Sequence, residues 1–600
     1  MQGGRVLDFD GFTVDLGSRL LLRGDRHVAL TPKAFDTLAV LLERPGEVLP
    51  KEQLLERVWS DTFVEEGILT QNIYTLRKAL QESGGTRNYI ETVPRRGYRF
   101  VGPVAEREAP EGPAWEAASV SSIAVLPFEP LTGNPDDAYL GLGLADALIT
   151  RLSNLRRLTV RPTSAVRRYL GVARDPAVVG RALQVEAVLD GTLQRSGDSL
   201  RVTVQLVGAR EAAPLWAAKF DARATDLFAL EDSISQELAE ELQLRLSRQE
   251  RDRLRRSPTP HPEAYDAYLR GRYFWNRRTL DGLEKAIASF RQAIALDSDF
   301  ALAHAGLADC YVLLPLYGAF APREVFPDAI AAAERALALD DFLAEAHTSL
   351  AYARFLYERR WEAAERGFRR AIDLNPGYPT AHQWYAFLLS ALGRHEDAIA
   401  QARQARDLDP LSLVINADSG MVLYFARQYP AAVEQFRKTL ELDSSFAYAH
   451  FGLGHAWQQQ GRLTEAVEEQ RRAVELAPGS PALQAALGQA LAWAGRPDEA
   501  RRILAELEER VARQYVESSD FAFLWTALGE PGRAIDRLEQ ACDERSRFVA
   551  FLATWPIYDP LRGHPRWPEL LERAGLADPH SPNPLSPAPS LPPSPGERGL

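Results

Sequence analysis

The chain has 600 residues, which is too long for one hydrophobic core and predicts three or four domains. Apolar residues make up 46% and charged residues 25%, so most of the chain should fold. The net charge of −12 excludes nucleic-acid binding over the whole surface, so any DNA site must be local.

Redox and targeting features point to a cytoplasmic protein. Cys310 and Cys542 lie far apart, which excludes a zinc cluster or a disulfide framework and fits a reducing compartment. The N-terminus has no apolar stretch that could serve as a signal peptide. The longest uncharged run, 310–322, is shorter than the ~20 residues of a membrane span. We therefore expect no membrane partner.

Residues 1–104 mix short β-like runs with three helical stretches. Runs between residues 5 and 30, broken by glycines, predict a small antiparallel sheet. Thr31 caps a helix with Pro32 in its first position, running to about residue 44. A second helix is predicted over 51–59 and a third over 66–81. This arrangement predicts an α+β domain.

The third helix has one apolar and one polar side. At 100° per residue, an apolar stripe consists of Leu69, Ile73, Leu76 and Leu80, which we expect to be buried. The opposite side carries Gly67, Gln71, Tyr74 and Lys78, flanked by Thr70, Thr75 and Arg77. Such a side can enter the major groove of DNA, although most polar helix faces are only solvated.

The segment after this helix favours the DNA interpretation. Residues 89–101 predict two strands around a tight turn at 94–97, with Arg95 and Arg96 at the tip and Arg99 behind them. Residues 67–104 hold six basic and two acidic side chains, whereas residues 43–66 hold three and seven. A local basic face on an acidic chain is the electrostatic signature of phosphate binding.

These motifs resemble a known family. Residues 64–80 (VEEGILTQNIYTLRKAL), followed by 92–100 (TVPRRGYRF), are similar to the OmpR/PhoB-type winged helix in the variant of CadC-like regulators. The resemblance covers nearly all of residues 6–103. It implies that the third helix enters the major groove, that the wing arginines approach the minor groove, and that the protein binds tandem sites as a homodimer.

The resemblance also supplies candidate contacts with double-stranded DNA. Base or phosphate contacts would come from Thr70, Gln71, Tyr74, Thr75 and Lys78, a phosphate contact from Arg77, and wing contacts from Arg95, Arg96 or Arg99. Family members often carry arginine where Tyr74 and Thr75 stand, so the base preference does not transfer.

After a polar linker at 105–121, residues 122–254 predict a small α/β domain. Buried-strand runs alternate with helices at 137–153, 177–183 and 226–246. The region resembles the TolB N-terminal-like domain and is expected to be structural or ligand-sensing. Gly141 and Gly143 are a weak nucleotide signal, and a packing role is favoured.

Residues 258–576 carry an internal repeat. Alanines recur every 34 residues without a slip, at Ala364, Ala398, Ala432, Ala466, Ala500 and Ala534. This period is typical of tetratricopeptide repeats, in which small residues let two helices approach closely. Division by the period gives about eight units, one with a nine-residue insertion near 316–327. The region predicts an all-α solenoid, and the Pro/Ser-rich residues 577–600 are expected to be disordered.

No motif for catalysis or a cofactor is present, including the Walker A and kinase motifs. Four histidines (His304, His347, His382 and His450) share one register of the repeat, which separates them along the solenoid and disfavours a metal site. The preferred hypothesis is a non-enzymatic transcriptional regulator whose repeats bind a protein partner. The alternative is a scaffold whose winged helix does not bind DNA specifically.

Overall fold

The computed structural model describes residues 5–15, 20–23, 26–28, 30, 32–58, 66–82, 88–94, 96–108, 120–131, 137–153, 155, 158–172, 174–210, 212, 214–223, 226–242, 258–317 and 320–576. Contacts divide the chain into two compact units, Met1–Val120 with Val204–Ala218, and Ser121–Thr203 with Lys219–Leu600. Within the described residues, no helix combines the length and the apolarity that crossing a bilayer requires. The predicted tail at 577–600 lies outside the described residues.

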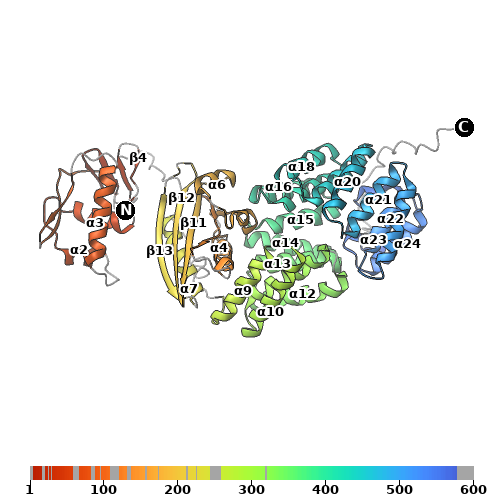
Figure 1. Cartoon of the computed structure of the whole chain (residues 1–600), viewed down its shortest axis with the longest axis horizontal. Helices are drawn as coiled ribbons and strands as arrows, with labels where there is room; N and C mark the ends of the chain where they lie inside the picture. The colour runs from red at the N-terminus through yellow and green to blue at the C-terminus, as the bar shows by residue number, and fades with distance from the viewer. Residues whose placement is uncertain are drawn as a thin grey trace. The chain divides into compact units, whose positions relative to one another are not determined.

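The N-terminal domain combines an antiparallel sheet, three helices and a hairpin (Figure 1). The sheet has the order β4-β3-β2-β1-β7. Its strands are β1 (Arg5–Phe9), β2 (Phe12–Asp15), β3 (Leu20–Arg23), β4 (Arg26–His27) and β7 (Ala105–Glu108). The helices are α1 (Pro32–Leu42), α2 (Lys51–Val58) and α3 (Glu66–Glu82), and the hairpin is β5 (Ile90–Val93) with β6 (Gly97–Phe100).

The predicted apolar stripe of α3 forms part of the core of this domain. Leu69, Ile73, Leu76 and Leu80 are at most 2% exposed. They join one hydrophobic cluster with the apolar side of α1 and with aromatic residues of the sheet and hairpin. The register of α3 predicted from its periodicity is therefore confirmed, and it fixes which side of α3 is exposed.

Strand β7 corrects the predicted start of the linker at residue 105. Ala105 to Glu108 pair antiparallel with β1, from Asp8 back to Arg5. Three of the four residues of β7 are charged, so no alternation of apolar and polar residues marked it as a strand. An edge strand can carry such a sequence because its backbone, rather than apolar burial, makes the pairing.

The middle region is an α/β domain. Its sheet has the order β10-β8-β11-β12-β13, and β9 pairs with β11. The strands are β8 (Ser122–Val125), β9 (Glu129–Pro130), β10 (Thr159–Val160), β11 (Ala187–Ser196), β12 (Ser199–Gly208) and β13 (Pro214–Arg223). The helices are α4 (Asp137–Ser153), α5 (Thr163–Val166), the 3-10 turn η1 (Arg167–Tyr169), α6 (Pro176–Ala182) and α7 (Leu227–Glu241). The sequence predicted neither α5 nor η1.

Gly141 and Gly143 have a packing role. Both lie inside α4 rather than at its first residue, so neither belongs to a phosphate-binding turn before a helix. A Cβ on Gly141 would lie 2.1 Å from the Phe128 carbonyl oxygen, and one on Gly143 would lie 3.2 Å from Leu269. Both glycines therefore permit close approach of α4 to its neighbours.

The C-terminal region consists of eight consecutive helix pairs in the described residues, shown from yellow-green to blue in Figure 1. They are α9 (Pro262–Trp275) with α10 (Leu280–Leu296), α11 (Ala301–Leu313) with α12 (Pro322–Leu339), α13 (Ala344–Ala353) with α14 (Trp361–Leu374), α15 (Pro379–Ala391) with α16 (His395–Leu408), α17 (Leu413–Phe425) with α18 (Tyr429–Leu442), α19 (Ala447–Gln459) with α20 (Leu463–Leu476), α21 (Pro481–Trp493) with α22 (Pro497–Arg510), and α23 (Ser518–Ala527) with α24 (Pro531–Asp543). The short turns η2 (Leu314–Tyr317) and η3 (Arg354–Glu358) follow α11 and α13.

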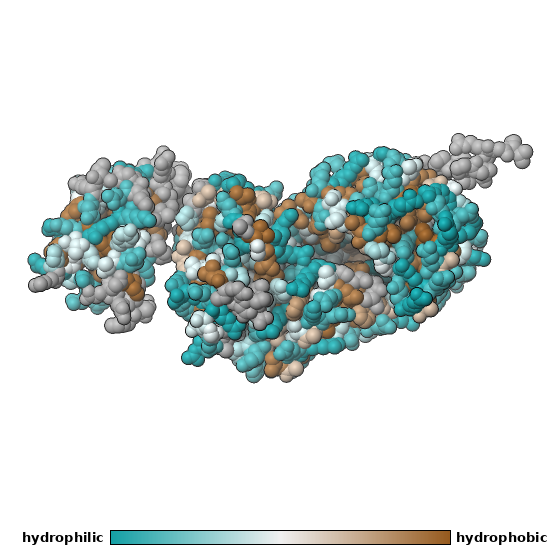
Figure 2. Space-filling model, viewed as in Figure 1, coloured by the Kyte–Doolittle hydropathy of each residue, from teal (hydrophilic) through white to brown (hydrophobic). Residues whose placement is uncertain are grey.

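The periodic alanines lie where the two helices of each pair meet. All six, from Ala364 to Ala534, are fully buried in the second helix of their pair. Figure 2 shows many hydrophilic residues on the visible face of the solenoid, with patches of apolar residues among them. The repeat therefore places its small residues at the helix contact and its charged residues in solvent.

A second 34-residue period appears in the backbone. Positive φ angles recur at residues 359, 393, 427, 461, 495 and 529, in the turn between the two helices of a pair. Four of these residues are glycines, which adopt this conformation without strain. In five of these turns the residue after the left-handed one donates to the carbonyl five positions earlier, as in Arg394 to Leu389, which is the Schellman pattern of a helix end. The exceptions to glycine are Arg359 and Arg427.

The last 30 residues of the repeat region do not continue the helix pairs but fold back onto the solenoid. They form η4 (Arg547–Phe551), η5 (Pro556–Leu561) and α25 (Trp567–Arg573). The Phe551 ring stacks on Phe425 at 4.9 Å and contacts Phe355 and Phe387 at 5.8 and 6.0 Å. This C-terminal segment (547–576) thus covers residues of η3, α15 and α17.

Two of the arginines with positive φ, Arg359 and Arg427, hold this segment. Arg427 donates two hydrogen bonds to the Asp559 carboxylate, at 2.6 and 2.8 Å. Arg359 donates to the carbonyl oxygens of Arg573 at 3.4 Å and Cys542 at 3.2 Å. These contacts join residues 132 to 214 positions apart in the chain and hold the C-terminal segment against the solenoid. We call this arrangement the closure of the solenoid.

Polar contacts also join the α/β domain to the solenoid within one compact unit. Arg161 is 6% exposed and donates to the carbonyl oxygens of Asp407 and Leu408 at the end of α16, at 2.5 and 2.8 Å. Arg272 of α9 pairs with the buried Asp146 of α4 at 2.7 Å. Because buried charges must be paired, these contacts make the junction specific.

Candidate DNA interface

The exposed side of α3 is the one predicted from the sequence. Thr70, Gln71 and Lys78 are exposed, and the Tyr74 side chain is 61% exposed. Thr75 is half-buried, and its hydroxyl donates to the Gln71 carbonyl oxygen at 3.0 Å. The α3 surface therefore presents an amide, a hydroxyl, an aromatic ring and an ammonium group, a set that can contact base edges and phosphates.

The sequence prediction missed Ile68. Its side chain is 46% exposed although it is a large aliphatic residue in the first turn of α3. On the helical wheel it lies next to Gln71, three residues along the chain. The available signal was an apolar residue outside the buried stripe of an amphipathic helix.

Arg77 contacts the hairpin rather than projecting outward. Its Nε and Nη2 atoms donate to the Ile90 carbonyl oxygen at 2.9 and 2.8 Å, and Nη2 also donates to the Thr92 hydroxyl at 2.7 Å. Hydrogen bonds from a charged donor are about twice as strong as neutral ones. The Arg77 guanidinium therefore fixes the position of β5 relative to α3.

The hairpin is also fixed from its other side. Tyr98 and Leu49 exchange backbone hydrogen bonds of 2.8 and 3.1 Å, which attach β6 to the loop before α2. At Gly97, φ is +140°, and a Cβ would lie 2.0 Å from the Leu49 carbonyl oxygen. Only glycine fits this contact, so the start of β6 has a defined position beside the loop before α2.

The wing arginines differ in their surroundings. Arg96 is exposed at the turn, and its backbone N–H closes the turn to the Val93 carbonyl at 3.0 Å. The Nε atom of Arg99 lies 2.7 Å from Glu91, and both side chains are partly exposed. Arg95 lies outside the described residues. The structure therefore brings Lys78 and Arg96 to the exposed surface of one domain, whereas Arg99 is partly neutralised.

The four histidines that share one register of the repeat have a structural function. In each, the ring Nε2 donates to the carbonyl oxygen six residues earlier, at 3.0 to 3.1 Å, for His304, His347, His382 and His450. In the unit between those of His382 and His450, Asn416 takes the equivalent position. Its side-chain amide makes the corresponding hydrogen bond to the Pro410 carbonyl oxygen at 2.9 Å. In the described residues, no group of three or more potential ligands could hold a metal ion.

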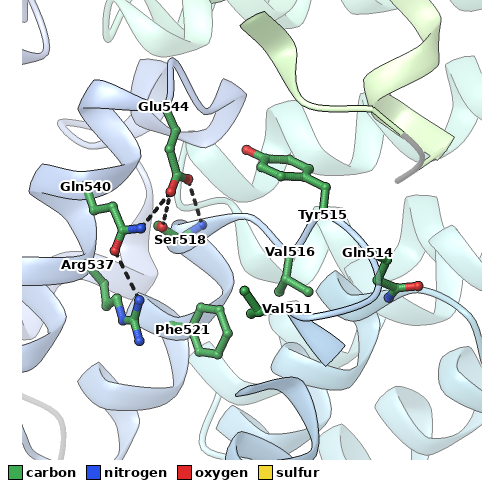
Figure 3. A pocket seen from close by; sticks show the side chains of 9 residues that line it. All are labelled: Val511, Gln514, Tyr515, Val516, Ser518, Phe521, Arg537, Gln540 and Glu544. Atoms are coloured by element: carbon green, nitrogen blue, oxygen red, sulfur yellow. Dashed lines mark hydrogen bonds between the residues drawn. The ribbon is translucent and has the colours of Figure 1, made fainter. Parts of the chain in front are cut away.

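A pocket of about 260 Å³ lies between the ends of α22, α23 and α24 (Figure 3). Glu544 accepts hydrogen bonds from the backbone N–H and hydroxyl of Ser518 at 3.3 and 2.7 Å. Arg537 donates to Gln540 at 3.0 Å and lies over the Phe521 ring. These polar groups are therefore bonded to one another at the edge of the pocket.

Comparisons with known proteins match all three regions. The family described as "Transcriptional regulatory protein, C terminal" matches residues 25–100, and the tetratricopeptide repeat family matches residues 354–412 and 418–481. The family described as "HilA/YgeH-like transcriptional regulator, second domain" matches residues 119–239. The resemblance of the middle region to TolB therefore stays a prediction.

Three relatives illustrate the range of similarity. The transcriptional regulator HilA of Salmonella typhimurium is 25% identical over 419 residues, covering 70% of this chain and 73% of HilA. The transcriptional activator CadC of Escherichia coli is 35% identical over 115 residues, covering 19% and 22%. A Rhizobium meliloti protein named adenylate cyclase 3 is 31% identical over 188 residues, covering 31% of this chain and 32% of its own length.

These matches confirm the outline of the sequence prediction. The chain has an OmpR/PhoB-type winged-helix DNA-binding domain and tetratricopeptide repeats, and its homologues include transcription regulators. The chain spans only about a third of the cyclase relative.

Proposed function

We propose that this protein is a sequence-specific transcriptional regulator that inserts α3 into the major groove of double-stranded DNA. The observation that carries the proposal is the exposed polar side of α3 next to a wing whose position is fixed. Gln71, Tyr74 and Thr70 would contact bases or phosphates, with Thr75 at the edge of the same surface. Lys78 would contact a phosphate, as positively charged side chains do in most complexes.

The wing would approach the adjacent minor groove. Arg96, with Arg95 and Arg99, would supply these contacts, and Arg99 would exchange Glu91 for a phosphate on binding. For Arg77 the proposed role is to hold the wing, because its guanidinium is already bonded to the hairpin. Binding of two copies to tandem sites is part of the proposal, as the resemblance implies.

The solenoid would bind a protein partner and transmit that event to the α/β domain. Stacked repeats offer extended surfaces for such contacts. The C-terminal segment (547–576) already covers Phe355, Phe387 and Phe425, so a partner would use other surfaces or displace this segment. The hydrogen bonds of Arg161 to backbone carbonyls and the ion pair of Arg272 support movement of the α/β domain and solenoid as one body.

The test is the salt dependence of DNA binding by the full chain. We expect affinity for a selected duplex to fall steeply with salt, and Lys78→Ala to reduce the slope of log K against log salt by about 0.9. The matched control is Gln81→Ala, an exposed but uncharged position of the same helix, which should leave the slope unchanged. Binding of random and selected duplexes with equal affinity would instead favour the scaffold hypothesis.

A further inference from the structure

The N-terminal half of α3 exposes apolar side chains around one amide. Ile68, Gln71 and Tyr74 are spaced by three residues, so they are neighbours on the helix surface. Ile68 and Tyr74 are 46% and 61% exposed, and Gln71 between them is also exposed. Large apolar groups gathered on a small exposed surface indicate a contact with another molecule.

This surface has no cationic group that could read guanine. Residues 66–76 of α3 contain neither lysine nor arginine. The first arginine, Arg77, uses its Nε and Nη2 atoms for the Ile90 carbonyl oxygen. Guanine is most often recognised by a bidentate arginine or lysine, and recognition helices contact base edges mainly with their N-terminal residues.

We propose that Ile68, Gln71 and Tyr74 make this protein select A·T base pairs where the N-terminal half of α3 meets the major groove, an inference that rests on the DNA binding proposed above. The Gln71 amide matches the N6 donor and N7 acceptor of adenine. The Ile68 side chain and the Tyr74 ring pack on the C5 methyl groups of the flanking thymines, the only apolar group in the major groove.

The first test is selection of bound duplexes from a random pool by the full-length chain, followed by affinity measurements for single-base changes. Wild type should select A·T pairs, and Gln71→Ala should reduce discrimination at one of them by about 5- to 150-fold. Gln71→Glu should change the preferred base at that position to cytosine, whose N4 group donates to a carboxylate. The control Gln81→Ala should leave the preference unchanged.

The second test removes only the thymine methyl groups. Replacing a contacted thymine by uracil should weaken wild-type binding by about fourfold, the factor for one buried methyl-sized group. Ile68→Ala or Tyr74→Ala should abolish this difference at one thymine each, whereas Tyr74→Phe should keep it. This measurement compares two duplexes with the same protein, so a variant with lower overall affinity still gives an answer.

The outcomes separate this inference from the proposed function. Failure of the wild-type chain to distinguish any selected duplex from random DNA would remove the proposed function itself. Selective binding to G·C pairs that depends on Gln71, or to A·T pairs that Gln71→Ala does not affect, would keep the function and overturn this inference. Equal affinity for thymine and uracil duplexes would overturn the methyl contacts.

Discussion

Arg427 provides the sharpest test of how the C-terminal segment is held on the solenoid. At this residue an unfavourable backbone conformation opposes a favourable ion pair. Its φ angle is +60°, a left-handed conformation that costs a non-glycine residue about 1–2 kcal/mol. Its guanidinium makes two charge-assisted hydrogen bonds to Asp559. With both side chains only about a quarter exposed, we estimate the pair at about 2–3 kcal/mol.

The two effects predict an unusual order of stability. Arg427→Ala keeps the backbone strain and loses the pair, so the closed C-terminal segment should be destabilised by about 2–3 kcal/mol. Arg427→Gly also loses the pair, but it removes the backbone strain. Glycine makes the unfolded chain more flexible, which offsets part of this gain, so the closed C-terminal segment should be destabilised by about 1–2 kcal/mol. The glycine variant should therefore be more stable than the alanine variant at position 427, although glycine is less stabilising than alanine inside a helix.

Hydrogen exchange followed by mass spectrometry measures this locally. Peptides from residues 547–576 should exchange about 30- to 150-fold faster in Arg427→Ala and about 5- to 30-fold faster in Arg427→Gly. Gly461→Ala is the matched control for strain, because Gly461 has a φ of +74° and no neighbour within 4 Å of an added Cβ. It should destabilise the end of α19 by about 1 kcal/mol and leave residues 547–576 unchanged. Equal exchange in the two Arg427 variants would refute the strain argument, and no change in either would refute the role of the pair.

Two further predictions concern Arg77 and Glu231. Arg77→Ala should weaken DNA binding by displacing the wing. It should change the slope of log K against log salt by clearly less than the ~0.9 of a lost phosphate contact. A change of the full ~0.9 would instead indicate that Arg77 contacts a phosphate. Burial raises the pKa of Glu231 to about 8, an effect that Arg151 at 4.0 Å and a hydrogen bond from Tyr265 only partly offset. Since this pKa is raised from 4.5, the stabilisation is complete below about pH 4.5 and is lost as the pH rises through 8. Glu231→Gln should therefore flatten the decline of the melting temperature between pH 5 and 8.5. An unchanged decline would show that the raised pKa of Glu231 does not cause it.

The sequence was most informative where one physical cause acts locally. The side of α3 that is exposed follows from the spacing of Leu69, Ile73, Leu76 and Leu80. Once this apolar stripe is buried, the rotation of the helix about its axis is fixed and the opposite side must face solvent. The solenoid follows from the 34-residue spacing of alanines, since each unit repeats the same helix contact. Both predictions need only neighbouring residues and the periodicity of a helix.

Predictions failed or were absent where distant residues decide the structure. The charged strand β7 owes its place to pairing with β1, about 100 residues earlier. The short helix α5 and the turn η1 pack where the α/β domain meets the solenoid, as Ser164 shows by donating to Asp409 at 2.5 Å. The hydrogen bond from Arg77 to the Ile90 carbonyl also joins residues that no helical wheel places together. Local patterns contain no information about such contacts.

The closure of the solenoid shows how departures from a repeat can be interpreted. Glycine relieves strain at the left-handed turn residue, so any other residue there must be maintained by a contact elsewhere. At Arg359 and Arg427, that contact is with the last α24 turn or the C-terminal segment. In the series of turns from 359 to 529, the two turns without glycine therefore belong to units that contact α24 or the C-terminal segment. Because the C-terminal segment covers these side chains, partner binding that required Phe355 of η3, Phe387 of α15 or Phe425 of α17 would have to compete with the Phe551 contacts.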